Sequence, residues 1–183
     1  MSEELLVRHG APTLAGLKTA NLFTCPCDSK QEILSFVRRQ NSRLQCKGLR
    51  MIPLRFSDDK ALLYLYRPGK LSADLSNAEA EALLTARGYD LSSCDRCVVQ
   101  LMRRLRQSQD FPHEIGLFLG YPAEDVRGFI ENSAKGCKCV GCWKVYGDEA
   151  AARKKFAQYK KCTRVYCQRF AQTHDIERLT VAG

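Results

Sequence analysis

Apolar residues recur at helical spacing after Asp28 and Ser29, either of which suits a helix N-cap. The pattern predicts a helix from this point to about Cys46, and Gly48 is a suitable stop just beyond it. The apolar positions near one face of this helix are Ile33, Phe36, Val37 and Leu44.

Two apolar runs then follow each other closely, at 49–56 and 60–67, with Ser57-Asp58-Asp59 between them. Runs of this composition separated by a short polar turn predict a β-hairpin. Pro53 has no backbone N–H to donate to a neighbouring strand. We therefore expect the first strand to lie at a sheet edge or to carry a bulge.

The rest of the chain is mostly helical in pattern. Helices are expected at 76–86, 94–108, 112–119, 122–131 and 148–172, beginning at Ser76, Ser92 or Ser93, Pro112, Pro122 and Asp148. The segment 143–147, WKVYG, has strand composition, whereas Pro12, Gly16 and Pro26 mark 10–27 as irregular. The pattern predicts an α+β fold in a single domain, 1–183. We expect a small antiparallel sheet of three or four strands, five or six helices, and flexible ends at 1–8 and 173–183.

The composition of the sequence predicts the cellular compartment of the protein. No apolar run approaches the roughly 20 residues that span a bilayer, so no membrane association is expected. MSEELLVRHG has early acids and no apolar signal core, which predicts a cytoplasmic protein. In that compartment the ten cysteines are expected to be thiols or metal ligands rather than disulfides.

Three closely spaced cysteines, Cys137, Cys139 and Cys142, form C-x-C-x-x-C between two glycines. Thiolates converging on a turn suit zinc or iron, so a metal is one hypothesis and incidental thiols are the other. Three ligands leave a tetrahedral site incomplete. The candidates for a fourth ligand are Cys25, Cys27, Cys94, Cys97, Cys162, Cys167 and His113.

Cys94 and Cys97 form a second C-x-x-C, at the start of a predicted helix. A helix N-terminus lowers a thiol pKa, which would suit a redox pair. Cys97 also belongs to an apolar stripe with Val98, Leu101 and Leu105, and buried cysteine packs as a small apolar residue. Core packing is the favoured interpretation.

His113 and Glu114 precede an apolar run and are candidates for acid–base or ligand chemistry. Adjacent residues on a helix point about 100° apart, so one of them is expected to have a structural role. Residue 117 is Leu, which excludes an H-E-x-x-H zinc motif. Lys18, within APTLAGLK, suits contact with an anionic group or a place at a core edge.

A second hypothesis concerns nucleic acid. Segment 113–132 resembles a helix-turn-helix in its apolar and glycine positions, and 135–169 carries ten Lys or Arg against two acids. The basic C-terminal helix would contribute Lys154, Lys155, Lys160 and Lys161. Against this, Glu124 and Asp125 stand where a recognition helix would begin, and a solvated basic helix face is the simpler explanation.

Three segments carry a family resemblance: HGAPTLAGLKTANLF (9–23), FPHEIGLFLGYPAEDVRGFIEN (111–132) and CWKVYGDEAAARKKFAQYKKC (142–162). They resemble the signature blocks of an uncharacterised bacterial family, a domain of unknown function seen mainly in anaerobes. The resemblance implies a stand-alone cytoplasmic protein in a reducing setting. It implies no reaction.

The leading functional hypothesis is a small-ligand or metal-binding protein with a pocket formed by the APTLAGLK, FPHEIG and WKVYG segments. Lys18 would contact an anionic ligand, His113 or Glu114 would supply acid–base or ligand chemistry, and Trp143 and Tyr146 would wall the pocket. DNA binding and a Cys/His enzyme are the alternatives. Because Walker A, G-x-G-x-x-G and G-x-S-x-G motifs are absent from the sequence, no nucleotide cofactor is expected.

Overall fold

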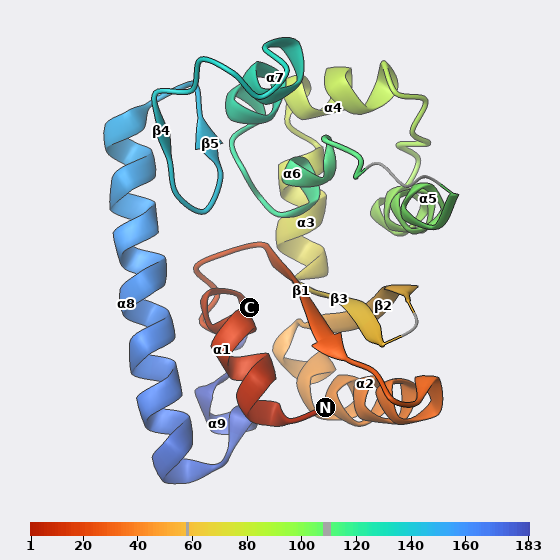
Figure 1. Cartoon of the computed structure of the whole chain (residues 1–183), viewed down its shortest axis with the longest axis vertical. Helices are drawn as coiled ribbons and strands as arrows, with labels where there is room; N and C mark the ends of the chain where they lie inside the picture. The colour runs from red at the N-terminus through yellow and green to blue at the C-terminus, as the bar shows by residue number, and fades with distance from the viewer. Residues whose placement is uncertain (58, 108–110) are drawn as a thin grey trace. The chain divides into compact units, whose positions relative to one another are not determined.

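A computed structural model describes residues 1–57, 59–107 and 111–183 of the chain (Figure 1). These residues fall into two compact units. The sheet unit comprises Met1–Gly69 and Tyr159–Gly183, and the helical unit comprises Lys70–Gln158. Two helices, α3 (Pro68–Leu75) and α8 (Glu149–Thr173), each contribute residues to both units. The single domain over 1–183 stays a prediction.

The sheet unit is built on three antiparallel strands, β1 (Ala20–Pro26), β2 (Arg50–Phe56) and β3 (Lys60–Tyr66), in the order β1-β3-β2. The predicted hairpin is confirmed as β2 and β3, although Asp58 in its turn lies outside the described residues. The prediction for Pro53 is also confirmed. Strand β2 lies at the sheet edge, and its register with β3 shifts between Pro53 and Arg55.

Helices α1 (Glu3–Leu14), α2 (Lys30–Leu44) and α9 (Ile176–Leu179) lie entirely in the sheet unit, with a 3-10 turn at Gln45–Lys47. Helix α2 agrees with the sequence pattern, and Gly48 ends this segment with φ of 74°. The core of the unit is formed by apolar side chains of α1, α2 and the sheet. Its members include Leu6, Val7, Phe23, Ile33, Phe36, Leu63 and Leu65.

The expectation that 10–27 is irregular was wrong. Pro12 lies inside α1 near its end, and Gly16, with φ of 70°, follows the end of this helix. Pro26 is the last residue of β1, an edge strand, where a missing N–H is tolerated. Helices α1 and α9 also occupy the two ends for which the sequence suggested flexibility.

The helical unit holds α4 (Ala78–Thr85), α5 (Cys94–Gln107), α6 (Ile115–Phe118) and α7 (Ala123–Glu131). All four were predicted, although the cap of α4 is Asn77 rather than Ser76. The Asn77 side chain accepts hydrogen bonds from the N–H groups of Glu79 and Ala80. Ser108, at the expected end of α5, lies outside the described residues.

The WKVYG segment forms β5 (Lys144–Val145), which pairs with β4 (Cys139–Val140) in a separate two-stranded sheet. The long helix α8 begins at the predicted place, where the Asp148 carboxylate accepts a hydrogen bond from Ala151 N–H. The α+β class is therefore confirmed. The number of helices was set too low, because α1, α3 and α9 occur among the described residues in addition to the six expected.

Candidate functional site: an aromatic pocket in the helical unit

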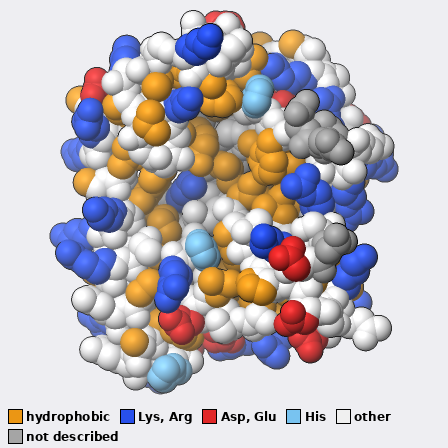
Figure 2. Space-filling model, in the orientation of Figure 1, with side chains coloured by type: hydrophobic (Ala, Val, Ile, Leu, Met, Phe, Trp, Pro, Cys, Tyr) orange, Lys and Arg blue, Asp and Glu red, His pale blue; other side chains and the backbone are white. Residues whose placement is uncertain are grey.

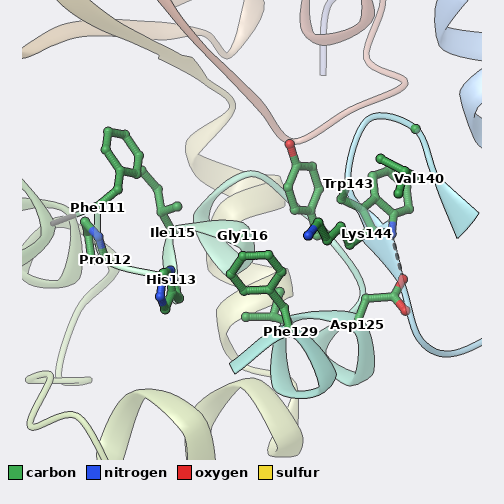
Figure 3. Close-up of a pocket in the computed structure, with 13 residues that line it drawn as sticks. Phe111, Pro112, His113, Ile115, Gly116, Asp125, Phe129, Val140, Trp143 and Lys144 are labelled. Atoms are coloured by element: carbon green, nitrogen blue, oxygen red, sulfur yellow. Dashed lines mark hydrogen bonds between the residues drawn. The ribbon is translucent and has the colours of Figure 1, made fainter. Parts of the chain in front are cut away.

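A cavity of about 440 Å³ opens beside α7 in the helical unit (Figure 3). Figure 3 shows Phe111, Pro112 and His113 on one side, Val140, Trp143 and Lys144 on the other, and Phe129 between them. The residues that line it are Phe111, Pro112, His113, Ile115, Gly116, Tyr121, Asp125, Val126, Phe129, Val140, Gly141, Trp143 and Lys144. Most of these side chains are apolar or aromatic.

Trp143 is fixed in the wall by a buried carboxylate. Its Nε1–H donates to Asp125 Oδ2 at 2.6 Å, and Asp125 is only 3% exposed. The other oxygen, Oδ1, accepts the backbone N–H groups of Tyr146 at 2.6 Å and Gly147 at 2.8 Å. A buried carboxylate with three donors is well compensated, so Asp125 ties the β5 segment to α7.

Aromatic packing holds the Trp143 ring from two sides. Tyr121 stacks on it with ring centroids 4.9 Å apart, and Phe156 meets it edge-on at 4.5 Å. Gly116 permits a close approach nearby, since a Cβ there would lie 2.7 Å from a Val126 methyl group. The pocket wall is thus formed by the fold before any ligand arrives.

Two groups with exchangeable protons face the pocket from opposite sides. The His113 and Phe129 rings pack edge-to-face, with their centroids 5.1 Å apart. Lys144 Nζ lies 5.7 Å from the centroid of the same Phe129 ring and donates to the Ala134 carbonyl at 2.8 Å. Phe129 is therefore the central side chain of the site, with an imidazole and an ammonium group on either side.

Glu114 points away from this pocket, as the divergence of adjacent helical positions predicts. Its carboxylate is buried and accepts the Tyr89 hydroxyl at 3.0 Å. It also contacts Arg87 Nε at 3.4 Å and Arg104 Nη1 at 3.5 Å. Burial, and then the Glu114 charge and hydrogen bond, raise the Tyr89 pKa far above its usual value, so this hydroxyl remains a donor. Of these two adjacent residues, His113 therefore lines the aromatic pocket and Glu114 does not.

The other predicted pocket residues divide between the units. Lys18 belongs to the sheet unit, where it is buried and its backbone N–H donates to the Pro12 carbonyl at 3.0 Å. The Tyr146 ring packs against Gly128, where a Cβ would lie 2.5 Å from Tyr146 Cγ. Of the proposed pocket residues, His113 and Trp143 line the cavity described above.

Sequence reasoning missed Phe129, Tyr121, Lys144 and Asp125 as pocket residues. Asp125 was interpreted only as an acid near the start of a helix. An acid directly beside Val126 on the buried face of a short helix was the signal that could have revealed it, because a buried carboxylate requires donors.

The described residues hold no group of three His, Cys, Asp or Glu side chains arranged to bind a metal ion. Cys137 and Cys139 are half-buried and Cys142 is exposed, around the β4–β5 turn. Zinc or iron at these three thiols stays a prediction. No cysteine is among the described residues that line the aromatic pocket, and the Cys/His enzyme also stays a prediction.

Among the remaining thiols, Cys97 and Cys162 are both buried. Cys97 is buried in α5, as the core interpretation predicts. Burial raises the pKa of Cys97 and raises that of Cys162 to about 11. These two groups are therefore thiols rather than thiolates near neutral pH.

The basic residues expected to meet nucleic acid are exposed on α8. Lys154, Lys155, Lys160 and Lys161 all face solvent, and Figure 2 shows many Lys and Arg side chains on the side of the view where α8 lies. In the helix-turn-helix-like segment, α6 has four residues, and Gly128 of α7 packs against Tyr146, the residue after β5. Nucleic-acid binding stays a prediction.

None of the described helices is long and apolar enough to cross a membrane.

The fold and the site together define an α+β protein with a preformed aromatic pocket in its helical unit. Residues 6–180 match the family described as "Protein of unknown function (DUF3793)", and the chain belongs to this family. Neither the curated proteins nor the solved structures contain a match to this chain.

Proposed function

We propose that this protein binds a small, largely apolar and planar ligand in the aromatic pocket of the helical unit. The observation that supports the proposal is the cavity of about 440 Å³ lined by Trp143, Tyr121, Phe129 and Phe111. Drug-sized ligands occupy pockets of about 300 to 1,000 Å³ with mostly apolar walls and few polar groups, and this pocket has both properties.

The arrangement of its walls favours binding of flat rings. Tyr121, Trp143 and Phe156 pack in succession, and Phe129 presents its ring between His113 and Lys144. Ring-to-ring contacts add to the free energy of burial when centroids lie about 4.5 to 7 Å apart. His113 and Lys144 would orient the polar edge of such a ligand, since each can donate a hydrogen bond.

Trp143 provides the test, because it is the single tryptophan of the chain and lies in the pocket wall. We would titrate the full-length protein with the neutral fluorophore N-phenyl-1-naphthylamine and follow energy transfer from Trp143. The expected result is saturable binding at one site per chain. Phe129→Ala should weaken this binding about tenfold, because a large part of the aromatic wall is lost.

Ile130→Ala is the matched control, since Ile130 is the next residue of α7 and does not line the pocket. It should leave the affinity within about twofold of the unchanged protein. Non-saturable energy transfer, or equal losses in the Phe129 and Ile130 variants, would contradict the proposal.

A further inference from the structure

A second cavity, of about 400 Å³, lies next to the aromatic pocket within the helical unit. It is lined by Arg87, Arg104, Gln107, Phe111, Pro112, His113 and Glu114. Phe111, Pro112 and His113 line both cavities, so the two share this segment as a wall, which Figure 3 shows at one end of the aromatic pocket.

The two arginines of this second cavity are held in place by the fold. Arg87 Nε and Arg104 Nη1 both contact the Glu114 carboxylate, at 3.4 and 3.5 Å. Arg104 also donates to the Arg87 carbonyl, and its guanidinium lies 4.5 Å from the centroid of the Tyr89 ring. Arg87 Nη1 donates to the Leu83 carbonyl at 3.4 Å. Glu114 therefore acts as a positioning residue for both guanidinium groups.

The charges at this cavity do not balance. Two guanidinium groups face one carboxylate, and Glu114 is the one acid among the described lining residues. A guanidinium carries five N–H donors, more than the contacts above occupy on either arginine. Planar, preoriented arginines with donors to spare favour carboxylate or phosphate, which they bind through paired hydrogen bonds.

We propose that the Arg87–Arg104 cavity binds the anionic head group of the ligand whose apolar body occupies the aromatic pocket. The ligand is then an aromatic or similarly flat acid, with a carboxylate or phosphate at Arg87 and Arg104 and His113 at the junction. This inference rests on the proposed function, since it concerns the same ligand.

The test uses two fluorophores that share one ring skeleton. N-phenyl-1-naphthylamine is neutral, whereas 8-anilinonaphthalene-1-sulfonate carries an anionic group. Energy transfer from Trp143 reports binding of either one, and the variants show whether it binds at the pocket. The combined variant Arg87→Gln with Arg104→Gln should weaken binding of the sulfonate probe about tenfold or more, because charged hydrogen bonds are lost. It should leave binding of the neutral probe within about twofold.

Glu114→Gln should strengthen binding of the sulfonate probe rather than weaken it. A gain in affinity cannot come from a variant that fails to fold. The amide keeps an oxygen for the Tyr89 hydroxyl and removes the competing negative charge. The sulfonate probe should then bind about threefold tighter or more, with the neutral probe unchanged. Arg103→Gln is the matched control, because Arg103 is exposed on the same helix and should change neither affinity.

The outcomes separate this inference from the proposed function. If the neutral probe binds at Trp143 but neither the arginine pair nor Glu114 affects the sulfonate probe, the inference fails and the proposed function stands. Loss of sulfonate binding in Lys144→Gln instead would place the anion at the opposite side of the pocket and also overturn the inference. If neither probe binds the unchanged protein, the proposed function itself fails.

Discussion

Arg67 in the sheet unit and Asp125 in the helical unit are buried charges that each hold together segments distant in sequence, but the two act in different surroundings. In the sheet unit Arg67 is 2% exposed, and its guanidinium donates to four backbone carbonyls. The acceptors are Thr13 at 2.7 Å, Leu14 at 2.9 Å, Val181 at 2.7 Å and Lys47 at 3.2 Å. In the helical unit Asp125 accepts two backbone N–H groups and the Trp143 indole.

The surroundings determine how much of the local structure depends on each charged side chain. Around Arg67, strand pairing and an apolar core already order the chain. The arginine joins the C-terminal end of α1, the turn after α2 and the C-terminal segment to that frame. Around Asp125 the only ladder described nearby joins strands of two residues, β4 and β5. Side-chain contacts must therefore order this region.

From this comparison we expect the largest loss of stability on substitution of Arg67. Arg67→Met should lower the free energy of unfolding by about 3 to 5 kcal/mol, because four carbonyl groups lose a buried donor. Urea denaturation followed by circular dichroism measures this change. Arg38→Met, at an exposed position of α2, is the control and should stay within about 0.5 kcal/mol. Equal effects of the two substitutions would show that Arg67 is dispensable for the sheet unit.

A smaller effect is expected at Asp125, because three donors rather than four carbonyls depend on it. Asp125→Asn keeps one oxygen but turns an N–H group toward the indole or the backbone donors, which should cost about 2 to 3 kcal/mol. Hydrogen exchange should show faster exchange at the Tyr146 and Gly147 amides, whereas the strands β1 to β3 keep their protection.

Glu131→Gln provides the control for this substitution, since Glu131 is exposed at the end of the same helix. Its free energy of unfolding should change by less than about 0.5 kcal/mol. Unchanged exchange at Tyr146 and Gly147 in the Asp125 variant would mean that the β5 segment is held by the rings alone.

The sequence pattern predicted the regular parts of both units. The hairpin β2–β3 follows from two apolar runs around a polar turn, and the edge position of β2 follows from Pro53. Prolines gave a wrong prediction elsewhere. Pro12 and Pro26 suggested an irregular segment, yet Pro12 lies inside α1 and Pro26 is the last residue of β1.

The site was predictable only in part, for a physical reason. Trp143 and His113 stand out as an aromatic and a titratable residue within apolar runs, and both line the pocket. The divergence of His113 and Glu114 could be anticipated, but which of them would turn toward Arg87 depends on tertiary packing. The pairing of Asp125 with Trp143 joins positions 18 residues apart in sequence, and no local pattern encodes it.

The smallest expected effect tests the close contact between α7 and the β5 segment. Alanine in place of glycine inside a helix normally stabilises it by about 1 kcal/mol. At Gly128, however, a Cβ would lie 2.5 Å from Tyr146 Cγ and 2.6 Å from its Cβ, so the Tyr146 ring and backbone would have to shift. Overpacking of this kind should outweigh the helix preference and leave Gly128→Ala destabilised by about 1 to 2 kcal/mol.

Gly69→Ala is the matched comparison, because Gly69 is also helical, in α3, and a Cβ there has no neighbour within 4 Å among the described atoms. This substitution should be neutral or stabilise the protein by up to about 1 kcal/mol. Thermal unfolding of the two variants side by side gives the sign of each change. A stabilised Gly128 variant would show that the β5 segment yields easily. The pocket would then owe its shape to the Asp125–Trp143 hydrogen bond more than to close packing, and Asp125→Asn should deform it correspondingly more.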